Sequence, residues 1–199
     1  MAPDLALSIA PLMVPELIFS KPPGLVPGSC NIAPMITEIP LNGADDETVW
    51  RPHVTVATIV PRQGRFLLVE EDIRGSRLIN QPAGHLEPGE SLADAARRET
   101  LEETGWEVRL DCLVAVQQWV HPRYDRHFVR FTYAATPVAH RADRALDDGI
   151  CEVLWLKRDE IAAASARLRS PLILSSIDAW LGGQRLPLSA LQHVGNGAA

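Results

Sequence analysis

The sequence predicts an α/β protein, with an α/β/α sandwich as its architecture. The predicted elements run as strands, a helix, further strands and two last helices, an order that fits this layering. The composition of the 199 residues, 46% hydrophobic and 22% charged, suffices for one packed core. No internal repeat is present, so one domain accounts for the pattern.

The first 50 residues are predicted to form a disordered extension, ahead of a folded domain at 51–191 and a flexible tail at 192–199. The extension carries half of the 16 prolines, no arginine and no clear apolar periodicity. It also holds one lysine and six acids, which leaves 18 basic and 19 acidic residues in the remainder. A nearly neutral domain favours small phosphorylated substrates as partners over long nucleic acid.

The chain is expected to reside in the cytoplasm, with no membrane partner. Its start lacks a basic residue, prolines interrupt the early apolar run, and no stretch is long enough to span a bilayer. The three cysteines, Cys30, Cys112 and Cys151, have no metal-ligand spacing, and a reducing compartment suits them.

Two strands open the predicted domain. HVTVATIV at 53–60 and RFLLVEED at 65–72 flank Gln63 and Gly64. A Gly-containing turn between two apolar runs predicts a β-hairpin.

A helix is predicted next, from about Leu92 to Thr104. Ser91, followed three residues later by Asp94, resembles a capping box, and Gly105 is placed to end the helix in a left-handed conformation.

Further strands are predicted at 108–120, 128–138 and 152–156, from their β-branched and aromatic residues. Two helices follow at 158–164 and 171–181, the second with Pro171 at its start and two glycines at its end. Four aromatic residues are expected in the core rather than in a ligand site: Trp106, Trp119, Phe131 and Trp155.

The most informative feature is an acidic stripe on the predicted helix. Glu99, Glu102 and Glu103 fall within an arc of roughly 100°, which Ala95 and Ala96 share. An ordinary surface helix places its acids opposite its small and apolar face.

Two interpretations of this stripe remain open from spacing alone. Arg98 and Glu102 can form an i,i+4 pair on a solvated face. Alternatively, the acids bind a cation, which the tight loop with Gly84, Pro88 and Gly89 favours. Clustered carboxylates suit a hard cation such as Mg²⁺, which binds substrate phosphates alongside one or two carboxylates.

The stretch GHLEPGESLADAARRETLEETGW at 84–106 resembles the Nudix box. Every charged or glycine position of that motif is matched: Gly84, Glu90, Arg98, Glu99, Glu102, Glu103 and Gly105. Thr100 and Trp106 depart from its two aliphatic positions, which concern packing of the helix. The resemblance implies a Nudix fold, in which the α/β/α sandwich contains a mixed β-sheet with the box helix on one face.

The resemblance also implies roles for the box residues. Metal ligands would be Glu99, Glu102, Glu103 and the backbone carbonyl of Gly84, holding Mg²⁺ with Mn²⁺ as a possible substitute. Glu99 and Glu103 are also the catalytic candidates within the box. Glu90 and Arg98 would hold the loop against the helix through charge-assisted hydrogen bonds.

Residues outside the box are expected to complete the site. The general base is a box acid, Glu99 or Glu103, or an outside acid, for which the candidates are Asp147, Asp148 and Glu152. Substrate binding is expected from the segment 121–130, through His121, Arg123, Tyr124, Arg126 and Arg130, since guanidinium groups bind phosphate bidentately. The alternative for this segment is an exposed hairpin loop with solvated charges.

The flanking segments 53–60, 80–91 and 169–188 resemble the NudJ-type subgroup of bacterial Nudix phosphatases, and the resemblance runs from about 51 to 191. It implies hydrolysis of phosphoanhydride bonds in nucleoside tri- and diphosphates and in thiamine-type pyrophosphates, with release of phosphate. The alternatives are a Nudix pyrophosphohydrolase that releases pyrophosphate or cleaves nucleotide sugars, and a non-catalytic nucleotide-binding module. The sequence does not give the oligomeric state.

Overall fold

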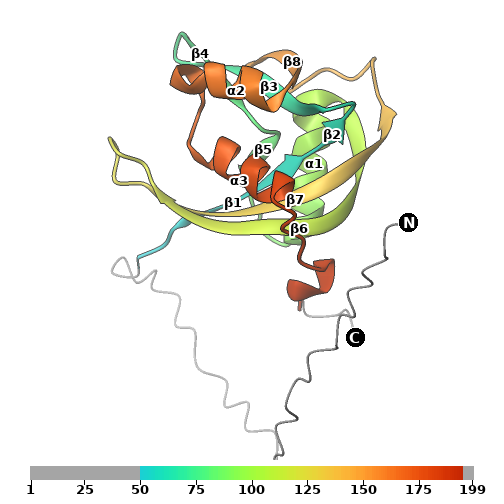
Figure 1. Cartoon of the computed structure of the whole chain (residues 1–199). Helices are drawn as coiled ribbons and strands as arrows, with labels where there is room; N and C mark the ends of the chain where they lie inside the picture. The colour runs from blue at the N-terminus through green and yellow to red at the C-terminus, as the bar shows by residue number, and fades with distance from the viewer. Residues whose placement is uncertain (1–49, 195–199) are drawn as a thin grey trace, which may run out of the picture. The chain divides into compact units, whose positions relative to one another are not determined.

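The computed structural model describes residues 50–194. The predicted extension therefore lies outside the described residues apart from Trp50, as do residues 195–199 of the predicted tail. None of the described helices is long and apolar enough to cross a membrane. The elements run in this order (Figure 1): β1 His53–Ile59, β2 Pro61–Arg62, β3 Arg65–Ile73, β4 Ser76–Asn80, β5 Ala83–His85, α1 Leu92–Thr104, β6 Trp106–Val120, β7 His127–His140, β8 Ile150–Leu156, α2 Arg158–Ala163, the 3₁₀ turn η1 Ser165–Arg167, α3 Leu172–Leu181 and the 3₁₀ turn η2 Leu188–Ala190.

Strands of the described region form two sheets. The first has the order β5-β1-β7-β6, with β1 and β7 parallel and the other neighbours antiparallel. It is the mixed sheet that was predicted, and the α/β fold class is confirmed. In the second sheet β3 is the central strand and pairs antiparallel with β2, β4 and β8. This smaller sheet was not foreseen as a separate unit.

The predicted opening hairpin is wrong in its pairing. Gln63 and Gly64 do form a turn with positive φ at both residues, 50° and 73°. The hairpin around it is short, however, because β3 pairs with the two-residue strand β2 and β1 lies in the other sheet. Both edges of β1 are occupied by β5 and β7, which leaves no edge for β3.

The core lies in two layers, one on each face of the mixed sheet. Because side chains alternate along a strand, Tyr133 and Ala135 of β7 join the layer beneath α1, while Ala134 joins the layer beneath α2 and α3. Ala95 and Ala96 bring α1 close to the sheet, and Ile173 and Ile177 do the same for α3. Helices on both faces make the predicted α/β/α sandwich (Figure 1).

The helix α1 has the predicted limits and caps. The Ser91 hydroxyl accepts a hydrogen bond from the Asp94 N–H at 3.1 Å, and Gly105 adopts φ 69° while its N–H donates to the Leu101 carbonyl. The last two helices are also close to their predicted ranges. Local capping chemistry thus set these boundaries correctly.

The aromatic residues were only partly placed correctly. Trp106 and Trp155 meet edge to face at 5.9 Å and, with Phe131, pack against the core layer beneath α1 while remaining half-buried. Trp119 belongs to neither core layer: it stacks on Phe128 at 5.5 Å near the end of β6. The core prediction for Trp119 is therefore wrong, because its strand extends beyond the helices that cover the sheet.

We expect the substitution Gly105→Ala to lower the free energy of unfolding by about 1–3 kcal/mol. The positive φ disfavours a side chain, and an added Cβ would lie 3.1 Å from the Arg141 carbonyl oxygen. Urea denaturation measures the loss. Gly183→Ala is the matched control, because Gly183 has φ +88° but open space around the Cβ position. If both variants lost the same free energy of unfolding, the close contact with the Arg141 carbonyl would not contribute to the loss.

Candidate active site

The loop before α1 brings Gly84 against the first acid of the stripe. A Cβ added to Gly84 would lie only 2.1 Å from Glu99 Oε1 and 2.2 Å from Glu99 Cδ. Only a glycine therefore lets the carboxylate lie against this backbone. The strand β5 is held in place by pairing with β1, where Gly84 is opposite Val56.

Two of the three acids of the stripe face the protein, and Glu102 is half-buried. Glu99 and Glu103 are each 8% exposed and lie on the same side of α1 as Ala95 and Ala96. Burial raises the pKa of Glu99. It also raises the pKa of Glu103 to about 9, although a hydrogen bond from the Ala83 N–H to Glu103 Oε2, at 2.9 Å, acts to lower it. Two enclosed carboxylates this close together call for additional positive charge.

Arg98 supplies part of that charge and links the loop to the helix. Its guanidinium donates to both oxygens of Glu90, at 2.7 and 3.0 Å, and to the His85 carbonyl at 3.1 Å. Its Nη1 also donates to Glu99 at 2.8 Å and to Glu102 at 3.1 Å. The i,i+4 pair with Glu102 thus exists as one contact within a larger network, on a half-buried face and not a solvated one.

Glu71 and Asn80 join the site, and sequence reasoning missed both. Glu71 lies on β3, is 8% exposed, and accepts a hydrogen bond from Asn80 Nδ2 at 2.7 Å. Its charge contributes to the raised pKa of Glu103. Strand alternation was the available signal, because Glu71 follows the buried Leu67 and Val69 at a spacing of two and so points inward.

Of the outside acids, the structure brings Asp147 to the stripe. Its N–H donates to the Glu102 carbonyl at 3.1 Å, and its charge helps to raise the pKa values of Glu99 and Glu103. Asp148 is exposed in the same turn.

Glu152 lies elsewhere. This exposed residue of β8 pairs in register with Glu70, whose carboxylate binds Arg77 and Arg167. Cross-strand partners share a face of the sheet, so Glu152 accompanies Glu70 and not the box acids.

The predicted substrate segment divides into two parts. Four of its residues lie in the connection between β6 and β7, where Arg123, Tyr124 and Arg126 are exposed and the His121 ring lies 4.7 Å from that of Tyr124. Arg126 is close enough to His85, the neighbour of Gly84, to help lower the pKa of that imidazole, after the larger effects of burial and of His53.

Arg130, by contrast, is buried on β7. It is 8% exposed, and its Nε and Nη1 have no hydrogen-bond partner among residues 50–194. Burial lowers the pKa of Arg130 to about 10, while the carboxylates of Glu71 and Glu103 oppose that shift. The structure thus separates Arg130 from the turn and places it beside the acids.

Comparison with known proteins identifies the family. A model of the NUDIX domain matches residues 49–175, more than half of the chain. The chain belongs to the Nudix family. It is 42% identical over 143 residues to phosphatase NudJ of Escherichia coli (strain K12), covering 72% of this chain and 92% of that protein. The predicted Nudix resemblance is confirmed, and the chain is a hydrolase.

Solved structures agree with this assignment. A Nudix hydrolase from Nitrosomonas europaea is 41% identical with a TM-score of 0.72, and the match covers 74% of this chain and all of that one. A UDP-X diphosphatase has the same fold, with 17% identity, a TM-score of 0.57, and coverage of 72% of this chain and 70% of its own.

The Nudix box residues have the right chemistry for the divalent cation that the family uses. Glu99, Glu102 and Glu103 offer hard oxygen donors, and the burial of Glu99 and Glu103 creates a demand for positive charge. In the structure Arg98 Nη1 meets part of this demand by binding Glu99, and it also binds Glu102. Glu103 accepts its hydrogen bond from the Ala83 N–H instead. Within residues 50–194 no three acidic, histidine or cysteine side chains are already arranged around a point where an ion could bind.

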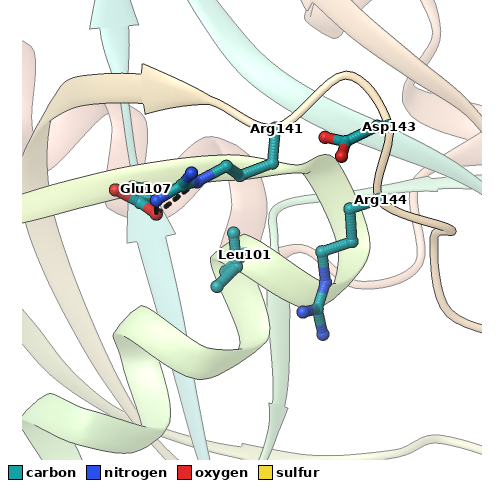
Figure 2. A pocket seen from close by; sticks show the side chains of 5 residues that line it. All are labelled: Leu101, Glu107, Arg141, Asp143 and Arg144. Carbon is teal, nitrogen blue, oxygen red and sulfur yellow. Dashed lines mark hydrogen bonds and ion pairs between the residues drawn. The ribbon is translucent and has the colours of Figure 1, made fainter.

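A surface pocket of about 320 Å³ lies beside the Nudix helix but does not include a box acid (Figure 2). Its lining residues are Leu101, Glu107, Arg141, Asp143 and Arg144. Figure 2 shows Arg141 turned toward Glu107, with which it forms an ion pair at 2.6 Å. The 3.8 Å contact between Arg144 and Glu102 links this pocket to the stripe.

We expect the free energy of unfolding of the metal-free protein to fall as the pH rises from about 5 to about 9. In this window the unfolded chain has lost the Glu103 proton, whose ordinary pKa is 4.5, while the folded chain retains it up to a pKa of about 9. The folded state then binds more protons, and stability decreases by at most ~1.4 kcal/mol per pH unit.

Urea denaturation in EDTA at several pH values measures this slope. The variant Glu103→Gln is the control, because its side chain does not titrate, and its stability should vary less with pH. Parallel profiles for the variant and the wild type would refute the contribution of Glu103.

Proposed function

We propose that this Nudix hydrolase is a Mg²⁺-dependent phosphatase that releases orthophosphate from nucleoside tri- and diphosphates and from thiamine-type pyrophosphates. The observation that carries the proposal is the pair of buried acids at the loop: Glu99 lies against Gly84, and Glu103 accepts from the Ala83 N–H. The 42% identity to phosphatase NudJ supports the choice of orthophosphate as product. Mn²⁺ is a possible substitute for Mg²⁺, since it also favours oxygen ligands.

The metal would be held by Glu99, Glu102, Glu103 and the Gly84 carbonyl. When bound, it neutralises phosphate oxygens and lowers the pKa of an attacking water. Arg98 holds the Nudix helix and the preceding loop in register, because its bidentate contact with Glu90 and its bond to the His85 carbonyl do not depend on the metal ligands.

The general base is proposed to be one of the acids that the fold gathers at the end of α1. Within the box these are Glu99 and Glu103. Asp147 is the outside acid with geometric support, because its backbone bonds to Glu102 and its carboxylate acts on both buried acids. The positions of Asp148 and Glu152 give them no comparable support.

The exposed turn between β6 and β7 is proposed to bind the part of the substrate beyond the phosphates. Tyr124 is 61% exposed, so a base or a thiazole-like ring can stack on it. Arg123 and Arg126 provide guanidinium groups for an anionic or polar group nearby.

The catalytic domain is proposed to span 51–191 and to act in the cytoplasm on small phosphorylated substrates. The NUDIX match over 49–175 and the extent of similarity to NudJ support the domain limits. Cys112 and Cys151 carry free thiols, which suits a reducing compartment.

With Mg²⁺ present, we expect orthophosphate as the product from ATP, GTP, ADP, GDP and thiamine pyrophosphate. An assay that separates orthophosphate from pyrophosphate measures this, with EDTA as the metal-free control. Pyrophosphate as the product from ATP or GTP would replace the proposal with the pyrophosphohydrolase alternative. No metal-dependent turnover on any substrate would favour a binding module.

We expect Glu103→Gln to lower kcat by about 100-fold or more, because the amide removes a charged metal ligand or base. Asp159→Asn is the control: this acid is 98% exposed on α2, remote from the stripe, and its loss should leave kcat unchanged. Steady-state kinetics on the best substrate compares the variants. Full activity in Glu103→Gln would exclude the proposed role.

A further inference from the structure

The helix α3 begins with an uncapped, buried N-terminus. Pro171 occupies the N-cap position, and no side chain of the described region caps the first turn. The N–H groups of Leu172 and Ile173 belong to residues that are 6% and 0% exposed. The first N–H groups of a helix have no partner within it, and together they favour an anion.

Two buried polar side chains, one before this terminus and one on the neighbouring sheet, also lack partners. Ser170, immediately before the N-cap, is 5% exposed, and its Oγ forms no hydrogen bond with residues 50–194. Arg130 is 8% exposed, with Nε and Nη1 both free in the described part of the chain. An unpaired buried guanidinium is costly, so a partner for it is expected.

The sheet places Arg130 beside α3. Gln117 of β6 is the cross-strand partner of Arg130, and its Nε2 donates to Ser175 Oγ, one turn into α3, at 3.0 Å. Arg169, next to Ser170, is close enough to Arg130 for its positive charge to help lower the pKa of Arg130, after the larger effect of burial. Arg130 also has the spacing of Ala134 along β7, and Ala134 packs in the core layer beneath α3. Arg130 therefore lies on the sheet face that α3 covers.

The two carboxylates near Arg130 do not satisfy it. Glu71 is engaged by Asn80 at 2.7 Å and lies 3.6 Å from Arg169, and Glu103 accepts from the Ala83 N–H. Neither carboxylate forms a hydrogen bond with Arg130 in the described structure.

We propose that Arg130, Ser170 and the N-terminus of α3 form an anion site that takes the terminal phosphate group of the substrate. The inference rests on the proposed phosphatase function, and it assigns Arg130 to a different task from the exposed turn. Burial argues for the terminal group: the free Nε, Nη1 and Oγ atoms are almost inaccessible, which excludes a nucleoside as their partner. Thr55 and Thr132, on the same sheet face as Arg130, offer further unpartnered hydroxyls.

Orthophosphate binding to the full chain in EDTA tests the site without turnover and without metal. Calorimetry gives the Kd, and the rise in Tm with phosphate gives an independent measure. Relative to wild type, Arg130→Gln should weaken binding by about 10- to 100-fold and Ser170→Ala by about 3- to 10-fold, as expected for charged and neutral hydrogen bonds.

Two features of the design keep the result decisive. Ser170→Ala removes a hydroxyl without a partner in the described structure, so it should fold normally even if Arg130→Gln does not. Arg109→Gln removes an exposed arginine of β6 and should bind phosphate like the wild type, and chloride at equal ionic strength should not raise Tm.

Equal phosphate affinity in wild type and either site variant, or no binding by the wild type, would overturn the anion site. This result is separable from the phosphatase proposal. A chain that binds orthophosphate through Arg130 but releases pyrophosphate from ATP would refute the proposed product and retain the site. The reverse pattern would retain the phosphatase and refute the site.

Discussion

The structure of the site depends on the single guanidinium of Arg98. Its donors reach the loop through Glu90 and the His85 carbonyl, and the helix through Glu99 and Glu102. Without this cation the loop would bring Glu90 toward Glu99 and Glu102 with no guanidinium between them to oppose the repulsion. The spacing of eight residues between Glu90 and Arg98 therefore fixes how the loop closes on α1.

Closing the loop has consequences for the packing around it. The Glu99 carboxylate lies where a side chain of residue 84 would be, so a glycine is required there. On the same buried face, the Thr100 hydroxyl lies 2.8 Å from that of Thr58 on β1 and donates to the Ala96 carbonyl. This pairing explains the departure from an aliphatic residue at position 100: a small polar contact joins α1 to the sheet where a larger side chain is usual in the motif.

Local patterns predicted the structure well where residues close in sequence decide it. The caps at Ser91 and Gly105 gave the limits of α1, and the spacing of the box gave its inward acids. Local patterns could not predict which strands, distant in sequence, pair with one another. The turn at Gln63 and Gly64 does not reveal that β1 pairs with β7 rather than β3. Nor does the sequence of residues 121–130 show that Arg130 lies buried on β7 and not in the exposed turn.

Arg98 and Arg130 both bring positive charge to the buried acids, but they do so in different ways. Arg98 binds Glu99 and Glu102 directly, whereas Arg130 approaches Glu71 and Glu103 without a hydrogen bond to either. A cation that compensates charge only at a distance keeps its donors free for another anion. In the proposed site these donors of Arg130 would bind a substrate phosphate, and the box acids would hold the metal that neutralises phosphate oxygens. The pairing of β7 with both β1 and β6 makes this arrangement possible, because it fixes Arg130 at the centre of the sheet.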